Sequence, residues 1–281
     1  MKAAVLRSVG EPLTIEDVQI SKPGAREVLV KTAAAGVCHS DLHFVKGLWP
    51  IPMPVILGHE SSGVVEQVGS DVTYVKPGDH VITCLSVFCG HCEHCLSGHM
   101  SRCSSPETRR RRDEPARLTK DDQPLFQFAN LSSFAEQMLI HEHGLVKIRD
   151  DMPLDRAALI GCAVTTGVGS VFHTAKVEPG SCVAVIGCGG VGLSCINGAA
   201  IAGAGRIIAI DTVASKLEMA AEFGATDVIN SSEGDPVDAV FELTTSGVHH
   251  SFEAIGLKET AEQAFSMLAV GGTATIIGMI P

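Results

Sequence analysis

The sequence predicts a two-domain α/β protein in which a β-rich domain precedes a domain built on a doubly wound parallel sheet. Its length of 281 residues suits two domains better than one. Residues 1 to about 165 hold short apolar runs separated by Gly and Pro turns, a pattern typical of β-strands. From about residue 181 onward, apolar runs alternate with Ala-rich helical stretches, as in βαβ units. We place the domains at residues 1–165 and 166–281.

In the first domain, the expected strands lie at 27–33, 62–68 and 80–83, and the polar stretch 104–127 is expected to be a long loop. In the second domain, strands are expected at 181–186, 206–210, 227–229, 251–254 and 273–277. Helices are expected at 192–202 and 214–223, the latter stopped by Gly224. The chain shows no internal repeat.

Composition excludes several classes of protein. Apolar residues make up 45% of the chain, which is enough to form cores and excludes disorder as the main state. The formal net charge of −11 argues against a nucleic-acid binder, and the one basic run, 109–112, is followed by Asp113 and Glu114. No apolar run is long enough to span a bilayer, and the N-terminus does not resemble a signal peptide. We therefore expect a soluble, cytoplasmic protein without membrane or nucleic-acid partners.

The strongest local motif is a cluster of cysteines. The chain has ten cysteines, and without a signal peptide such residues indicate metal binding or catalysis more than disulfides. Four of them lie close together, at Cys89, Cys92, Cys95 and Cys103. Four thiolates can surround one zinc ion tetrahedrally and leave no open position, so this site is predicted to be structural. The histidines between them are expected to be solvated and not to bind the metal; they are His91, His94 and His99.

A second set of candidate ligands is dispersed along the chain. It comprises Cys38, His59 and Cys162. Two cysteines and one histidine form a known ligand set for catalytic zinc, which keeps one position open. Taken singly, each residue is weak evidence, because a lone buried Cys is usually a small hydrophobe and a lone His is usually structural.

A third motif follows the strand expected at 181–186. It contains Gly187, Gly189, Gly190 and Gly192, and Asp211 follows nineteen residues after the last of them, at the end of the next strand. Glycines between a strand and a helix, with an acidic residue at this distance, are the fingerprint of dinucleotide binding. The glycines let a pyrophosphate approach the helix N-terminus, where free N–H groups favour anions. A Gly-rich turn that serves packing alone is the weaker alternative.

The three motifs, in this order, resemble the zinc-dependent alcohol dehydrogenases of the medium-chain dehydrogenase/reductase superfamily, including its class III members. The resemblance covers the whole chain and implies a GroES-like catalytic domain, a Rossmann domain, two zinc ions and NAD. It further implies that Cys38, His59 and Cys162 hold the catalytic zinc and that Asp41 orients the His59 ring. Glu60 is implied as a catalytic residue beside the metal, either as an alternative ligand or as a supporting group. Ser40 and His43, the latter expected near the surface, match the family's proton relay.

The resemblance also assigns the cofactor and substrate contacts. Asp211 and Lys216 would bind the adenosine ribose and favour NAD over NADP, and Val191 and Thr166 would flank the nicotinamide. Backbone groups of Ile277 and Met279 would hold the carboxamide. The implied substrate lining is large and apolar, which favours a hydrophobic primary alcohol or aldehyde over a glutathione adduct; it consists of Trp49, Leu85, Phe128 and Leu139.

Three alternatives stay open: a polyol or nicotinoprotein-type dehydrogenase of the same superfamily, a non-catalytic NAD-binding protein, and an inactive fragment. The doubly wound fold has six strands, whereas five are counted here from residue 181. We expect strand 273–277 to form an uncovered sheet edge and the chain to be a fragment that is poorly soluble or weakly active alone. Full-length relatives are expected to form homodimers or tetramers.

Overall fold

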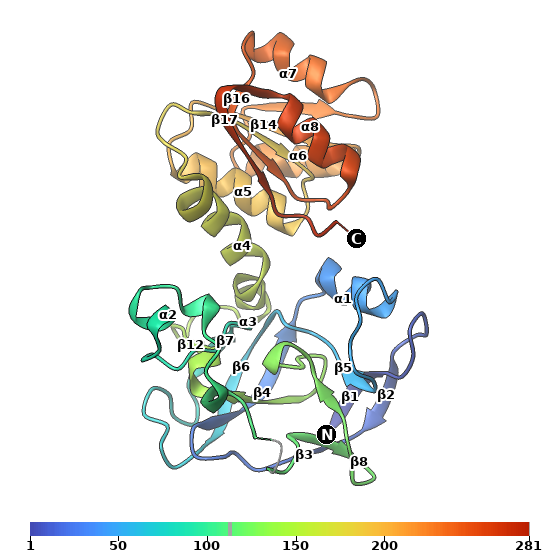
Figure 1. Cartoon of the computed structure of the whole chain (residues 1–281), viewed down its shortest axis with the longest axis vertical. Helices are drawn as coiled ribbons and strands as arrows, with labels where there is room; N and C mark the ends of the chain where they lie inside the picture. The colour runs from blue at the N-terminus through green and yellow to red at the C-terminus, as the bar shows by residue number, and fades with distance from the viewer. Residues whose placement is uncertain (112–113, 281) are drawn as a thin grey trace. The chain divides into compact units, whose positions relative to one another are not determined.

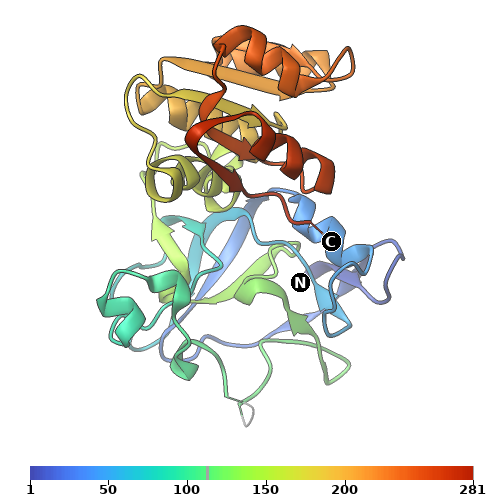
Figure 2. The same cartoon turned by 45° about the horizontal axis from the view of Figure 1, so that its top comes forward.

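The computed structural model describes residues 1–111 and 114–280, and it divides the chain into two compact units after Cys162 (Figures 1 and 2). The boundary falls three residues before the one placed from the sequence. Three positions named above lie outside the described residues: Arg112 of the basic run, Asp113 after it, and Pro281 at the end of the predicted second domain. Each unit has its own sheets and its own core.

The first unit is centred on a five-stranded antiparallel sheet (Figure 1). The strand order is β11-β4-β6-β7-β12, and every neighbouring pair is antiparallel. One face buries a core of branched side chains, among them Val28, Val30 and Ile140. The three strands expected from the sequence are all present within two residues of their predicted ends. The five strands are β4 (Glu27–Ala35), β6 (Ser61–Val68), β7 (His80–Thr83), β11 (Gln137–His141) and β12 (Leu145–Lys147).

Two smaller sheets complete this unit, with strand orders β10-β5-β1-β2 and β3-β8-β9. Their strands are β1 (Lys2–Leu6), β2 (Thr14–Asp17), β3 (Gln19–Ile20), β5 (Val55–Ile56), β8 (Leu118–Lys120), β9 (Gln123–Pro124) and β10 (Phe126–Gln127). The helices are short: α1 (His39–Val45), α2 (Glu93–Leu96) and α3 (Leu154–Ala157). Single 3₁₀ turns are η1 (Met100–Arg102), η2 (Pro106–Thr108), η3 (Phe128–Asn130), η4 (Glu142–Gly144) and η5 (Ala158–Gly161).

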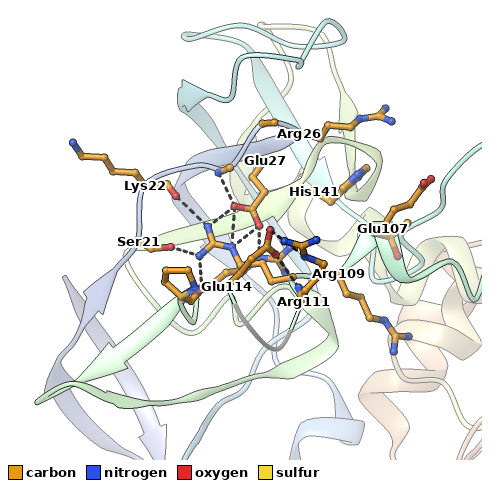
Figure 3. A pocket seen from close by; sticks show the side chains of 15 residues that line it. Ser21, Lys22, Arg26, Glu27, Glu107, Arg109, Arg111, Glu114 and His141 are labelled. Atoms are coloured by element: carbon orange, nitrogen blue, oxygen red, sulfur yellow. Dashed lines mark hydrogen bonds and ion pairs between the residues drawn. The ribbon is translucent and has the colours of Figure 1, made fainter.

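The stretch 104–127 is not the long loop that its polarity predicts, because η2, β8, β9 and β10 all lie in it. A buried carboxylate fixes its described part: Arg110 Nε and Arg117 Nε donate to Glu27 Oε1 over 3.0 and 2.7 Å. Glu27 lines a pocket of about 730 Å³, and Figure 3 shows its carboxylate among the dashed hydrogen bonds there. None of the predicted zinc ligands lines that pocket. Glu27 therefore acts as a structural anchor in strand β4.

The second unit holds a five-stranded parallel sheet in the order β15-β14-β13-β16-β17, as its sequence predicts (Figure 1). The strands are β13 (Cys182–Ile186), β14 (Arg206–Asp211), β15 (Asp227–Asn230), β16 (Val248–Glu253) and β17 (Leu268–Ile276). The helical elements are α4 (Ala163–Gly169), η6 (Ser170–Ala175), α5 (Gly190–Ile201), α6 (Ala214–Glu222), α7 (Pro236–Thr244) and α8 (Lys258–Ser266). Helices α7 and α8 were not predicted.

Both faces of this sheet are covered, which explains the continuous apolar runs in its central strands β13 and β14. Helices α5 and α6 pack on one face, and α7 and α8 pack on the other. Strand β17 lies at one edge of the sheet, as expected, and Val270 within it is fully exposed. No single helix in the described ranges is long and apolar enough to cross a membrane; only the broken pair 154–161 and 163–175, taken together, reaches that length and hydropathy.

Candidate active site and metal centres

Four cysteines converge in the lobe that contains α2 and η1. Cys95 Sγ lies 3.8 Å from Cys89 Sγ and 3.5 Å from Cys92 Sγ, and Cys92 Sγ lies 3.9 Å from Cys103 Sγ. Four sulfurs placed tetrahedrally at the usual Zn–S distance of about 2.3 Å are separated by about 3.8 Å. The observed spacing therefore fits one zinc ion with four thiolate ligands, and it leaves no position for a substrate.

Backbone N–H groups of this lobe favour the thiolate form that zinc requires. The His91 amide, together with that of Cys92, lowers the pKa of the Cys89 thiol to about 6. The Cys89 amide in turn donates to Cys103 Sγ over 3.3 Å. His91, His94 and His99 are exposed, and His91 Nε2 lies 3.2 Å from a Glu107 carboxylate oxygen. Sulfur already completes the ligand set, so the histidines have no vacant position to fill.

The dispersed ligands also meet, although they come from three separate segments of the first unit. Cys38 caps the N-terminus of α1, His59 follows β5, and Cys162 follows η5. Cys162 Sγ lies 3.9 Å from Cys38 Sγ and 3.4 Å from His59 Nε2. A tetrahedral zinc with Zn–S of about 2.3 Å and Zn–N of about 2.0 Å places these pairs about 3.8 and 3.5 Å apart. The three side chains fit a zinc ion with one open position, which is the catalytic type.

The two thiols influence each other's acidity. The hydrogen bond from Cys162 lowers the pKa of the Cys38 thiol, and the same contact raises the pKa of Cys162. Glu60 adds negative charge that acts on Cys162 in the same direction. A divalent cation would stabilise the thiolate form of both sulfurs.

Asp41 holds the ligand His59 in one orientation. Its buried carboxylate Oδ1 lies 3.2 Å from His59 Nδ1, so the ring donates through Nδ1 and directs the Nε2 lone pair toward the two thiols. The same carboxylate accepts from the Cys38 amide over 3.2 Å and from the Gly58 amide over 3.1 Å. One carboxylate thus holds the Cys38 backbone, the Gly58 backbone and the His59 ring in place at the metal centre.

Glu60 is buried beside this centre, next to the backbone of Gly36. A Cβ at position 36 would overlap the Glu60 carboxylate, so only glycine leaves room for it. The Gly36 amide also donates to the Glu60 carbonyl oxygen over 2.7 Å. The position agrees with the neighbourhood that the family resemblance implies, and it makes Glu60 a neighbour of the ligand set rather than a member of the triad.

The relay residues lie on α1. Ser40 Oγ is 3.7 Å from Cys38 Sγ. On α1, Ser40 lies about one helical turn before His43. The expectation that His43 lies near the surface is wrong, because only 9% of the residue is exposed. The rings of Trp49 and His39 contact its imidazole edge-on at centroid distances of 5.2 and 5.0 Å. This burial lowers the pKa of His43, so the imidazole is neutral and able to accept a proton near pH 7.

A wall of half-buried aromatic rings stands next to the ligands. Phe128 contacts the His59 ring at a centroid distance of 5.6 Å, and Phe44 links Phe128 to Trp49 at 4.9 and 5.7 Å. Sequence reasoning missed Phe44, although its place after His43 on the same helix was a usable signal. Leu85 is 43% exposed.

Leu139 does not line this site, contrary to the expectation from the sequence. Its side chain is fully buried in strand β11, where it stands opposite Leu29 of β4, and it exposes no surface to a ligand. Its neighbours Met138 and Ile140 belong to the core cluster on one face of the sheet, so alternation along β11 places Leu139 on the other face, where it is also fully buried.

The second unit presents the glycine-rich turn between β13 and α5. Gly187 has a φ of +92°, and a Cβ on Gly192 would overlap the Gly187 carbonyl oxygen, so the turn and the close helix approach both need glycine. Helix α5 begins at Gly190, after the N-cap Gly189, with its N-terminal amides at the carboxyl end of the sheet. This arrangement fits a pyrophosphate.

Asp211 ends strand β14 beside this turn and is 7% exposed. Its carboxylate accepts from the Cys188 amide over 2.8 Å and from the Val213 amide over 3.0 Å. Lys216 Nζ lies 3.7 Å from the same carboxylate. Asp211 therefore shapes the glycine-rich turn as well as offering a carboxylate to a ribose.

The remaining predicted contacts lie around the same sheet edge. Helix α4, which carries Thr166, packs through Gly167 against the Val191 carbonyl of α5. Ile277 and Met279 directly follow β17, and the Ile277 amide donates to the Glu253 carbonyl oxygen of β16 over 2.8 Å. Val191 follows the carboxyl end of β13, and Ile277 and Met279 follow that of β17, at the edge where dinucleotides bind in doubly wound folds; Thr166 comes from α4 instead.

Two family models match the chain: "Alcohol dehydrogenase GroES-like domain" over residues 24–150 and "Zinc-binding dehydrogenase" over residues 190–281. An S-(hydroxymethyl)glutathione dehydrogenase of Photobacterium damsela subsp. piscicida is 43% identical and covers 99% of this chain, which spans 78% of that protein. An alcohol dehydrogenase class-3 of Oryza sativa subsp. japonica is 41% identical, with coverages of 99% and 75%.

Among solved structures, the benzyl alcohol dehydrogenase of Acinetobacter calcoaceticus superposes with a TM-score of 0.91 at 36% identity, over 100% of this chain and 77% of that one. Both zinc ligand sets, the doubly wound second unit and these matches agree. The chain therefore belongs to the zinc-dependent alcohol dehydrogenases of the medium-chain dehydrogenase/reductase superfamily.

Proposed function

We propose that this chain catalyses the NAD-dependent oxidation of hydrophobic primary alcohols to aldehydes, together with the reverse reduction. The observation that carries the substrate class is the row of aromatic rings from His59 to His43, formed by Phe128, Phe44 and Trp49. Apolar rings beside the reacting centre favour an aromatic or long aliphatic substituent, because binding it removes apolar surface from water. A structural neighbour at 36% identity is a benzyl alcohol dehydrogenase, which supports the same class.

The roles of the side chains follow from their positions in the first unit. Cys38, His59 and Cys162 would hold a zinc ion, which supplies Lewis acidity toward an alcohol oxygen. Asp41 keeps His59 in the tautomer that binds through Nε2. Ser40 and His43 provide a path for the alcohol proton, and the neutral imidazole of buried His43 is its acceptor. Phe128 orients the apolar substituent of the substrate next to His59.

NAD is the proposed hydride acceptor because Asp211 stands at the end of the second strand of the sheet. Its carboxylate can accept from the ribose hydroxyls and would repel the 2′-phosphate of NADP. Lys216 is close enough to share this role, with its Nζ 3.7 Å from the carboxylate. The cofactor itself supplies the hydride chemistry, and the chain supplies its placement.

A substrate panel tests the proposal. For the purified, zinc-loaded chain with NAD, we expect kcat/KM for benzyl alcohol to exceed that for ethanol by at least about tenfold, as one well-filled apolar pocket allows. Phe128→Ala should remove most of this preference, whereas Leu85→Ala, at a residue 43% exposed, should change it much less. Preference for S-(hydroxymethyl)glutathione over benzyl alcohol would contradict the substrate class and leave the reaction type intact.

A further inference from the structure

Glu253, the last residue of β16, is a fully buried acid at the carboxyl end of the parallel sheet. One oxygen of its carboxylate is well satisfied. Oε1 accepts from the Ile255 amide over 2.9 Å, from the Gly256 amide over 2.8 Å and from Thr260 Oγ1 over 2.8 Å. These donors belong to the turn between β16 and α8 and to the first turn of α8. They are dipoles, and none of them carries a full positive charge.

The other oxygen, Oε2, is buried and has no hydrogen-bond partner among the described residues. It lies against Gly278, where a Cβ would come within 2.5 Å of it. The Glu253 carbonyl oxygen also accepts from the Ile277 and Gly278 amides over 2.8 and 3.0 Å. Glu253 therefore contacts the segment Ile277–Met279 with both its carboxylate and its backbone carbonyl. The carboxamide of a nicotinamide is expected to bind to this segment.

In the described part of the chain, no Lys, Arg or His forms an ion pair with Glu253. A buried, unpaired negative charge is costly, and native structures retain one only where something compensates it. Glu253 lies on β16, the neighbour of β13 in the sheet, and the crevice outside the carboxyl ends of these two strands is where the strand order reverses. Dinucleotides bind at this point, and the nicotinamide ring is cationic only in the oxidised cofactor.

We propose that the Glu253 carboxylate discriminates between the two redox states of the cofactor. Its negative charge makes the site bind the cationic nicotinamide of NAD⁺ in preference to the neutral ring of NADH. The proposal rests on the proposed use of a nicotinamide cofactor. Glu253 acts on the ring through the electric field of its charge, across the Ile277–Met279 backbone, and needs no direct contact. It is a positioning residue for that backbone and a source of specificity for the oxidised cofactor.

The test uses Glu253→Gln, which keeps the shape and one acceptor oxygen but removes the charge. The dissociation constants of NAD⁺ and NADH are measured separately on the zinc-loaded chain. The ratio Kd(NAD⁺)/Kd(NADH) should rise about tenfold, which is the effect of a charge interaction of about 1.4 kcal/mol. Two controls keep the charge of Glu253. Glu262→Gln makes the same substitution at a side chain 66% exposed on α8, and Thr260→Val removes one donor to Oε1.

Both controls should leave the ratio Kd(NAD⁺)/Kd(NADH) within about twofold of the parent value, even if Thr260→Val weakens the binding of both cofactors equally. A ratio in Glu253→Gln within twofold of the parent would overturn the proposal, and so would an equal weakening of both redox states. If the parent binds NADP⁺ and not NAD⁺, only the assignment of NAD as the cofactor fails. The proposal for Glu253 is then tested by measuring the same ratio with NADP⁺ and NADPH. If the parent binds neither cofactor, both proposals fall. If Glu253→Gln does not fold, the test uses Glu253→Asp, which keeps the charge on a shorter side chain. This variant is expected to retain the parent ratio Kd(NAD⁺)/Kd(NADH). A tenfold rise in that ratio would refute the proposal.

Discussion

Replacing Glu27 with glutamine tests how the first unit holds its irregular segment 104–127. Glu27, labelled in Figure 3, is 8% exposed at its side chain, and its carboxylate accepts hydrogen bonds from Arg110 and Arg117. Burial alone would raise the pKa of its carboxyl, but the hydrogen bond from Arg110 and the charge of Arg117 outweigh burial and lower the pKa from 4.5 to about 2. At 1.36 kcal/mol per pKa unit, the ionised form contributes about 3 kcal/mol to stability at pH 7.

Glu27→Gln should therefore destabilise the first unit by about 3 kcal/mol, the range found when one partner of a buried ion pair is removed. For a unit of this size, that corresponds to a fall in melting temperature of about 6–12 °C by calorimetry on the zinc-loaded chain. The control is Asp151→Asn, because Asp151 and its partner Arg149 are 70% and 84% exposed and should contribute less than about 1 kcal/mol.

The pH dependence gives a second check. Glu27 has a lowered folded-state pKa, so its contribution is fully present above pH 4.5 and is lost as the pH falls toward about 2. The stability difference between parent and Glu27→Gln should be constant from pH 5 to 8 and should shrink below pH 4.5. Loss of zinc at low pH affects both proteins and cancels in the difference. A destabilisation at pH 7 no larger than that of Asp151→Asn would refute the reasoning.

Three further predictions concern the proposed chemistry. Asp41→Ala should weaken zinc binding at the Cys38 site about 10–100-fold in chelator competition, because His59 loses its orienting carboxylate, while the four-cysteine site should keep its zinc. His43→Gln should slow alcohol oxidation at least about 100-fold near pH 7 and much less near pH 10, where hydroxide can take the proton; a pH–rate profile that overlays the parent's would exclude His43 from the relay. Asp211→Gly should lower the ratio of kcat/KM with NAD to kcat/KM with NADP by about tenfold or more. A parent enzyme that already prefers NADP would contradict the role of Asp211.

The sequence was most informative where residues that act together are close along the chain or stand in a spacing with a known physical cause. The four cysteines from Cys89 to Cys103 and the glycines from Gly187 to Gly192 are of this kind. The parallel sheet was also predictable, because strands buried on both faces read as continuous apolar runs. Helix α7 was missed although Asp235 caps it and Pro236 begins it, a signal that the sequence carries.

Other features depend on contacts between residues distant in the sequence. The Glu27 anchor joins β4 to arginines more than eighty residues away, so the polarity of 104–127 gave no sign of its order. The ring of Trp49, which follows α1, contacts His43 and contributes to its burial, and Leu139 is buried on the face of β11 opposite the core residues Met138 and Ile140. Neither periodicity nor composition encodes these contacts, because each is set by tertiary packing.

Zinc content measured together with activity tests the central claim most directly. Elemental analysis of freshly purified, unchelated chain should give two zinc ions per chain, one for each ligand set. During treatment with a chelator, the zinc at the open Cys38 site should leave first, and NAD-dependent oxidation of benzyl alcohol should fall in proportion to it. The zinc bound by the four cysteines should remain after activity is lost. A chain that holds one zinc or none, or that keeps its activity after the first zinc has left, would contradict the account.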